Sequence, residues 1–453
     1  MALPKRLVGG TPRKKASAPS NQTIVSIFTS VNLFWTFTPY NLPFTTYNLL
    51  KLHHNLVAAV IDILLLIFNG GKYADQVIEN KLKSNPKWGA KDRRFITQLA
   101  YELVRNWRLV AHLSPPVDPS YATPQEVWLM VGTWLYLQYN ELPSWDELNG
   151  LDTQRLKSAH QKALTVRKIA YSIPDWLDDL GSTQMGEKRW ASAINAMNKQ
   201  ANVYIRANKT RINRQTLQGV LLKEAVETKL ISLAPDALLV EGRKNVVATK
   251  AFHNGLFEVQ DAGSQLIAPY LDPRPNMTVI DACAGGGGKT LHISALMQNK
   301  GKIIALDVED WKLDNLKERA KRNGISIIQT QAIISPNSIA QYTQKADRLL
   351  LDVPCTGLGT LRRKPDIKWK LSPEKLQQTL DLQQHILSVY SQMLRVGGLM
   401  VYATCSILPL ENEEQIKQFL AQNPNFTLLG EQFVSPAAFA TDGFYMAKMI
   451  RNH

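Results

Sequence analysis

The sequence predicts an α/β protein, in which a domain built on a doubly wound, parallel sheet follows an all-helical domain and a small α+β domain. Three observations support this prediction. Buried strands alternate with helices from about residue 256 onwards, which is typical of a parallel sheet. Apolar residues recur at helical spacing over residues 47–166, whereas residues 167–255 mix both patterns. The length of 453 residues also exceeds what one ordinary core accommodates.

Residues 1–46 precede these three domains. The first 61 residues hold six Lys/Arg and no Asp/Glu, and residues 24–37 form a mostly apolar run. A signal or transit peptide would look partly like this, although no small-residue cleavage site follows clearly. A disordered basic arm, or an upstream extension from a misplaced start, fits as well. We expect a basic, disordered extension and leave its role open.

The first domain, residues 47–166, is expected to be helical throughout. Residues 49–68 are strongly apolar and stop at a glycine pair. Residues 92–113 carry apolar side chains at helical spacing, and residues 126–137 form another apolar helix. No catalytic pattern occurs here, so we expect a binding or docking module. Its four arginines in the second helix, which either extend a basic track or form a solvated face, are Arg93, Arg94, Arg105 and Arg108.

The second domain, residues 167–255, mixes helix and strand. Residues 191–200 and 216–227 are expected to form helices, and residues 203–208 and 237–241 are expected to form strands. This order fits a small α+β domain.

The third domain, residues 256–453, repeats strand and helix. Its expected strands are residues 277–282, 302–308, 326–332, 348–353 and 399–404. Its expected helices are residues 289–297, 311–323, 373–394 and 411–421. A ligand of such a sheet lies at the carboxyl ends of the strands, so the candidate site residues are sought there.

Composition restricts the partners and the compartment. The net charge of +15 favours a polyanion such as nucleic acid, although many other soluble proteins are also basic. The chain has three cysteines, a small and odd number that argues against a disulfide framework. This points to a reducing, cytoplasmic setting. No stretch approaches the roughly 20 apolar residues that span a bilayer. We expect a monomer that binds neither membrane nor metal.

Four consecutive glycines join the first strand of the third domain to its first helix, in the run VIDACAGGGGKT of residues 279–290. Glycine lets a backbone approach a ligand closely, and three ligand classes use such a turn. A phosphate-binding loop requires glycine where this chain has Cys283, and a dinucleotide fingerprint counted from Gly285 requires it at Thr290. S-adenosylmethionine, which has no phosphates, remains. The loop residues expected to line its site are Asp281, Cys283, Ala284, Gly285, Gly287 and Gly288.

Asp307 supplies the acid that such a ligand needs. It ends the second strand, 20 residues beyond Gly287, where a carboxylate can accept hydrogen bonds from both ribose hydroxyls. The alternative is that Asp307 caps the following helix, but Asp310 is better placed for that role.

Two cysteines close two strands of the same sheet. Cys355 follows the strand LLLDVP, and Cys405 follows the strand LMVYAT. Parallel strands bring both thiols to the edge that holds the proposed cofactor, with Asp352 three residues before the first. A thiolate there would suit methyl transfer to C5 of cytosine. Its addition to C6 makes C5 nucleophilic, and covalent catalysis divides one difficult step into easier ones. Asp352 is the candidate to hold the N3/N4 edge of the base.

These motifs resemble the bacterial ribosomal RNA cytosine-C5 methyltransferases of the Sun-type family. The runs that carry the resemblance are DACAGGGGKT, ALDVED, DRLLLDVPCTGLGTLRRKPDIKW, GGLMVYATCSILPLENEEQI and DGFYMAKMI. The run GAKDRRFITQLAYELVRNW resembles that family's NusB-like RNA-binding domain, so the resemblance covers residues 48–453. It implies a Rossmann-like methyltransferase domain, S-adenosylmethionine as cofactor, and RNA, in particular ribosomal RNA, as substrate.

The resemblance also implies residue roles. Cys405, in the TC motif, would be the nucleophile, and Cys355, in the PC motif, would assist release of the product. DNA cytosine methyltransferases use the PC cysteine instead, so reasoning from the residues alone leaves the two open. Lys289 and Asp307 would line the cofactor site, and Asp352 would lie between cofactor and base.

The sequence departs from the family pattern at two places. Gly285-Gly286 replaces the usual Ala-Pro, which loosens the turn, and the acid expected after the third strand is absent from QTQAIIS, residues 329–335. The second departure leaves an alternative open, namely a catalytically impaired RNA-binding factor in ribosome assembly.

A basic run follows the PC motif and predicts phosphate contacts beside a flipped base. Trp369 in this run would either stack on a base or belong to the core. The residues expected to bind RNA are Arg362, Arg363, Lys364 and Lys368.

Overall fold

The computed structural model describes residues 52–114, 121–242 and 244–453. The extension expected over residues 1–46 lies outside these ranges. In the described part of the chain no helix is both long and apolar enough to cross a membrane.

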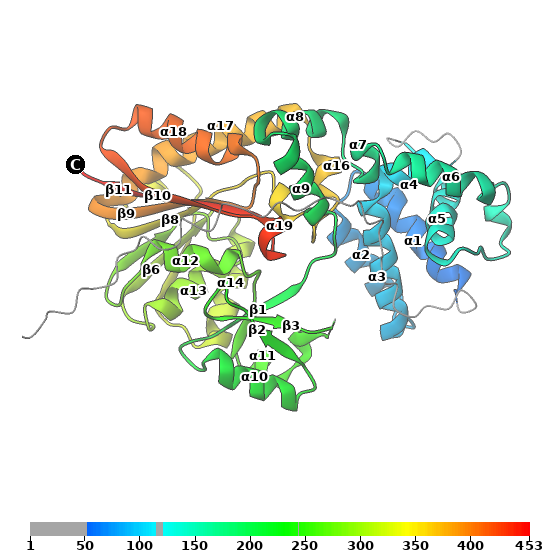
Figure 1. The fold of residues 1–453 in the computed structure, drawn as a ribbon. Coiled ribbons are helices and arrows are strands. Elements are labelled where there is room, and N and C mark those ends of the chain that lie inside the picture. The colour runs from blue at the N-terminus through cyan, green and yellow to red at the C-terminus, as the bar shows by residue number, and fades with distance from the viewer. Residues whose placement is uncertain (1–51, 115–120, 243) are drawn as a thin grey trace, which may run out of the picture. The chain divides into compact units, whose positions relative to one another are not determined.

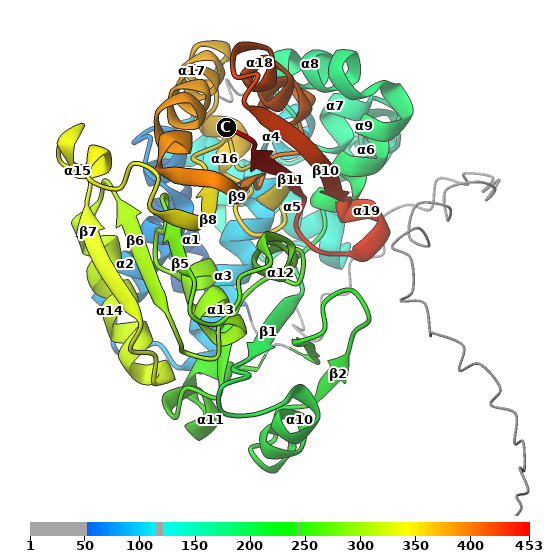
Figure 2. The same cartoon turned by 90° about the vertical axis from the view of Figure 1, so that its left-hand side faces the viewer.

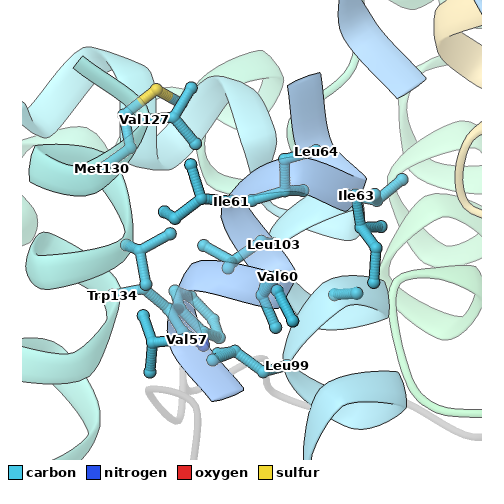
Figure 3. Packing of buried hydrophobic residues seen from close by; sticks show 14 of the residues in the cluster. Val57, Val60, Ile61, Ile63, Leu64, Leu99, Leu103, Val127, Met130 and Trp134 are labelled. Atoms are coloured by element: carbon cyan, nitrogen blue, oxygen red, sulfur yellow. The ribbon is translucent and has the colours of Figure 1, made fainter. Parts of the chain in front are cut away.

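The first domain is helical, as expected (Figure 1). Its helices are α1 (His54–Phe68), α2 (Ala74–Ser84), α3 (Ala90–Arg105), α4 (Trp107–Leu113), α5 (Pro124–Tyr139) and α6 (Thr153–Ala163). Side chains of α1, α3 and α5, among them Val60, Leu103 and Trp134, point towards one another and form the core (Figure 3).

The single helix expected over residues 92–113 is divided into α3 and α4 at Asn106. The backbone of Asn106 leaves the helical region, with φ −108° and ψ 19°. Its side-chain amide donates to Glu102 O at 3.0 Å, and such local hydrogen bonds compete with a continuous helix.

The middle segment separates into two parts. The helices α8 (Asp175–Met185) and α9 (Glu187–Met197) pack in one apolar cluster with residues of the third domain, including Leu358 and Leu408. Ile169 of α7 (Arg167–Ala170) packs instead in a cluster with Leu109 of α4. The remainder forms a four-stranded antiparallel sheet in the order β2-β3-β1-β4, and α10 (Arg214–Lys223) and α11 (Lys250–His253) contribute to its core. Its strands are β1 (Val203–Ala207), β2 (Thr228–Leu230), β3 (Ala237–Val240) and β4 (Phe257–Val259). Because β4 pairs with β1, this sheet extends beyond the boundary expected at residue 255.

The third domain is built on a seven-stranded sheet in the order β10-β11-β9-β8-β5-β6-β7 (Figure 2). The strands are β5 (Thr278–Asp281), β6 (Lys302–Asp307), β7 (Ile328–Ala332), β8 (Ala346–Asp352), β9 (Leu394–Thr404), β10 (Phe426–Val434) and β11 (Phe444–Arg451). The five strands from β9 to β7 are parallel, as expected. The antiparallel pair β11 and β10, which had not been expected, extends the sheet beyond β9.

Helices cover both faces of this sheet, which confirms the doubly wound arrangement (Figure 2). On one face α17 (Pro373–Tyr390) and α18 (Glu413–Gln422) bury Leu387 and Phe419 against the strands. On the other face α12 (Ile267–Leu271) and α13 (Gly288–Leu296) do so with Leu271 and Ile293. α14 (Asp310–Asn323) packs beside α13. Because the strands from β9 to β7 are parallel, their carboxyl ends lie at one edge of the sheet, where the candidate site residues gather.

Candidate active site

The glycine turn lies between β5 and α13. Gly285 and Gly287 adopt positive φ angles of 52° and 80°. A Cβ atom on Gly287 would approach Leu316 of α14 to 2.1 Å, so only glycine permits this close packing.

Asp307, at the end of β6, holds this turn. Its Oδ2 accepts from the Gly285 amide at 2.8 Å, and its Oδ1 accepts from the Glu309 amide at 2.9 Å. The second hydrogen bond lies directly before α14, so Asp307 also contributes to the start of this helix, as the capping alternative predicts in part. The ribose contact expected of Asp307 stays a prediction.

Asp281 and Cys283 lie beneath the turn. Asp281 Oδ2 accepts from Thr290 Oγ1 at 2.7 Å, whereas its buried Oδ1 has no partner. Burial raises the pKa of Asp281 to about 7. Burial likewise raises the pKa of Cys283 well above its ordinary value, and the side chain packs against the apolar core of the sheet. Cys283 is therefore a poor nucleophile, in contrast to the exposed or activated thiols that catalysis uses.

Lys289, in the first turn of α13, faces Asp352 at the end of β8. The distance from Lys289 Nζ to Asp352 Oδ2 is 2.5 Å. Burial lowers the pKa of Lys289, but the Asp352 carboxylate more than offsets this effect, so the pKa lies above its ordinary value. The pair thus places a fixed positive charge next to a partly exposed carboxylate.

The two cysteines of the PC and TC motifs meet. Cys355 Sγ and Cys405 Sγ lie 3.3 Å apart, and both side chains are partly exposed. The hydrogen bond with Cys405, together with burial, raises the pKa of the Cys355 thiol. Two adjacent thiols resist double ionisation, so the two are not both thiolates at once.

Glu411 organises both cysteine loops, and sequence reasoning missed it. Its fully buried carboxylate accepts from the Thr356 amide at 2.7 Å and from Thr356 Oγ1 at 2.5 Å, beside Cys355. It also accepts from Ser406 Oγ, beside Cys405, and from Gln383 Nε2 at 3.1 Å. The neighbouring acids Glu413 and Glu414 suit a helix start equally well, so no local signal identifies Glu411.

The small sheet braces the glycine turn. The buried Arg206 of β1 donates to Gly288 O at 2.8 Å. Arg319 of α14 donates to Gly286 O and also to Glu258 of β4, at 2.8 Å from Oε2. The turn that lacks the family's proline is therefore held by two guanidinium groups.

Most of the cations expected to bind RNA are engaged inside the protein. Arg363 donates to Asp442 and Asp261, each at 2.7 Å, and the buried Arg362 donates to Gln200 O at 3.0 Å. Lys368, only 2% exposed, donates to two backbone carbonyls. These placements argue against the expected RNA contacts of Arg362 and Lys368, because neither side chain has surface left for a phosphate. Lys364, in contrast, is exposed.

Three of the four candidates on the helical domain are also engaged within the protein. Arg93 donates to three backbone carbonyls, and Arg108 donates to Ile173 O at 2.6 Å and to Asp175. Arg105 is buried, whereas Arg94 is exposed. Trp369 packs against the helical core, which settles its two alternatives in favour of the core.

Residues 329–335, at and after β7, hold no acid, and apolar side chains are exposed in this region. Ile334 is 87% exposed there. Val308 and Trp311, which follow β6, are 67% and 62% exposed.

The glycine turn, the acid at the end of the next strand and the lysine–aspartate pair define a class of protein, the S-adenosylmethionine-dependent methyltransferases. The residues fit this cofactor for two reasons. Asp281 Oδ1 has no hydrogen-bond partner, and the glycines of the turn let the backbone approach a ligand closely. In the described residues no group of His, Cys, Asp or Glu could hold a metal ion.

Comparison with known proteins identifies the family. The model of the 16S rRNA methyltransferase RsmB/F domain matches residues 268–450, and that of an RsmF/B-like ferredoxin-like domain matches residues 173–247. The probable ribosomal RNA small subunit methyltransferase B of Synechocystis sp. is 31% identical over 80% of this chain and 88% of its own length. Its counterpart in Bacillus subtilis is 28% identical over 86% of this chain and 97% of its own length. This chain therefore belongs to the RsmB/F family of methyltransferases.

A solved structure agrees with this assignment. The crystal structure of PH0851 has 26% sequence identity and a TM-score of 0.70, and the match covers 87% of this chain and 98% of that one.

Proposed function

We propose that this chain methylates C5 of a cytosine in small-subunit ribosomal RNA, through a covalent thiolate adduct at C6. The observation that carries the proposal is the 3.3 Å separation of Cys355 Sγ and Cys405 Sγ beside the Lys289–Asp352 pair. The relatives named as small-subunit rRNA methyltransferases support the substrate class. A substrate of this kind is consistent with the cytoplasmic location expected from the sequence.

The roles of the side chains follow from their chemistry. The Cys405 thiolate bonds to C6, and the C5–C6 π electrons move towards C5. Asp352 holds the N3/N4 edge of the base, and Lys289 keeps that carboxylate oriented. The glycine turn and Asp307 would hold S-adenosylmethionine, whose sulfonium would supply the methyl group that bonds to C5 and would keep the electron pair of the broken S–CH3 bond. The C5 proton then leaves to a base, the S–C6 bond breaks, and Cys405 departs as a thiolate, a release that Cys355 assists.

Nucleoside analysis tests this proposal. The purified chain is incubated with methyl-labelled S-adenosylmethionine and unmodified small-subunit rRNA, and the digested RNA is separated by chromatography. We expect label in 5-methylcytidine with the natural protein and none with Cys405→Ala. Label in any other nucleoside would overturn the C5 assignment. Bisulfite sequencing of rRNA from cells with and without the gene then locates the cytosine.

The absence of an acid in residues 329–335, where Ile334 is exposed, favours a second candidate function, namely an RNA-binding assembly factor with impaired catalysis. The family resemblance places at this position an acid near the adenine of the cofactor, and its absence would weaken affinity. Isothermal titration with S-adenosylmethionine separates the two. Saturable binding favours the enzyme, and no detectable heat favours the assembly factor.

A further inference from the structure

Residues 361–371, which we call the anchor segment, follow the PC motif and dock onto the helical domain. Lys368 Nζ donates to Arg105 O at 2.8 Å, and Trp369 Nε1 donates to Val104 O at 2.8 Å. Lys370 Nζ donates to Ile67 O at 2.6 Å. The acceptors are carbonyls in the last turns of α3 and α1. Such carbonyls have no partner within their own helix and favour cations.

The helical domain grips the anchor segment in return. Arg105, at the end of α3, donates to Leu361 O at 2.9 Å and to Arg362 O at 2.8 Å. The buried Asp366 accepts from the Ala74 amide, at the start of α2, at 2.9 Å. The contact therefore runs in both directions and fixes the register of the segment on three helices.

The buried Lys368 makes this docking specific. Its ammonium group lies among backbone carbonyls, with Tyr171 O at 3.2 Å as the second acceptor. Burial lowers the pKa of Lys368 well below its ordinary value, and the nearby charge of Arg105 lowers it further. A buried polar group costs free energy unless it finds hydrogen-bond partners, and the two carbonyls supply them for Lys368. The segment is consequently held in one geometry and tolerates little slippage.

The other end of the anchor segment reaches the nucleophile. The short 3-10 helix Leu358–Thr360 leads directly into the segment, and its Gly359 amide donates to Cys405 O at 2.9 Å. A Cβ atom on Gly359 would come within 2.7 Å of the same carbonyl, so the two backbones are in close contact. A continuous path thus joins the end of α3 to the backbone of Cys405.

We propose that Lys368 and Arg105 are positioning residues, through which docking of the helical domain sets the place of the Cys405 thiol relative to Cys355. The proposal rests on the function proposed above. It gives the helical domain a part in the chemical step, beyond any contact with RNA.

The variant Lys368→Met tests it in the full-length chain, because methionine keeps the apolar stem and removes the donors. We expect kcat to fall by about tenfold or more, as misplaced reacting groups do. The KM for RNA and the Kd for S-adenosylmethionine should stay within about twofold, because neither site is touched. Lys417→Met, at an exposed lysine of α18, is the matched control and should leave all three values unchanged.

Thiol reactivity supplies a readout that needs no RNA. The rate of alkylation of Cys405 by iodoacetamide is followed by peptide mass spectrometry as a function of pH. A loosened anchor segment should speed it by about threefold or more and shift its pH profile, since thiol reactivity follows local environment and access. Failure of the proposed function would abolish formation of 5-methylcytidine by the natural protein, yet it would leave this readout informative.

Arg105→Lys covers the case in which Lys368→Met does not fold. It keeps the charge, loses the fork that binds two carbonyls, and should give the same kinetic pattern. Folded variants that retain kcat within twofold would overturn the proposal. An increase in KM alone would overturn it too, because the helical domain would then serve RNA binding only.

Discussion

Cys355 Sγ and Cys405 Sγ lie 3.3 Å apart at neighbouring strand ends, although 50 positions separate the two residues in the chain. The hydrogen bond between the two thiols raises the pKa of Cys355. In the proposed mechanism, one thiol therefore acts as the nucleophile and the other stays protonated.

This relationship predicts opposite outcomes for the two alanine variants. Cys405→Ala should lower methylation by at least about 10³-fold, because no thiolate remains to add to C6. Cys355→Ala should accumulate RNA covalently bound through Cys405, visible as a slow band on a denaturing gel. The double variant is the control and should show no such band. Full turnover by Cys405→Ala would show that the nucleophile is wrongly assigned.

Glu411 should matter for stability as well as for activity. Glu411→Gln replaces an acceptor by a donor opposite the Thr356 amide and hydroxyl, and should destabilise the fold by about 2 kcal/mol. It should also reduce kcat, because both cysteine loops lose their common support. Thermal unfolding and steady-state kinetics measure the two effects. The exposed Glu414→Gln, three residues along, should change stability by less than about 0.5 kcal/mol. Equal effects from the two substitutions would contradict the role of Glu411.

Substitutions of the two arginines of α14 test whether the glycine turn needs support from Arg319 for cofactor binding. Arg319 reaches both Glu258 and Gly286 O, whereas Arg322 reaches Glu258. Arg319→Lys should therefore raise the Kd for S-adenosylmethionine by about tenfold, because a lysine cannot bridge both acceptors. Arg322→Lys should leave the Kd nearly unchanged. Isothermal titration decides, and equal affinities in the two variants would show that the turn needs no brace.

Asp281 predicts a pH dependence of stability. Burial raises its pKa from 3.8 to about 7, so the folded protein prefers the neutral carboxyl. The stabilisation that the neutral Asp281 carboxyl gives the folded state is fully present below about pH 4 and is lost as the pH rises through about 7. Asp281→Asn cannot ionise, and relative to the natural protein it should gain on the order of 2 kcal/mol between pH 5 and pH 8. Denaturant unfolding at the two pH values measures the difference. Parallel losses in both proteins would mean that Asp281 is already charged in the folded state.

The sequence by itself determined the architecture of the third domain and the meeting of its two thiols. Strand periodicity is a local property, and parallel strands necessarily end at one edge of a sheet. The meeting of Cys355 and Cys405 therefore follows from their positions in the sequence. The glycine turn and Asp307 were found for the same reason, because each stands at a strand end. The strands β10 and β11 were not expected, since antiparallel addition at a sheet edge leaves no alternation with helices.

Only the tertiary structure decided which charges are used internally. Lys368 looks like a phosphate ligand within its basic run, yet its acceptors are the carbonyls of Arg105 and Tyr171, 263 and 197 positions away. Glu411 looks like any acid at a helix start, yet it joins the two cysteine loops. A charged side chain carries no local sign of its partner. Whether it faces water or a buried acceptor depends on contacts between distant segments, and those contacts exist only once the domains have packed.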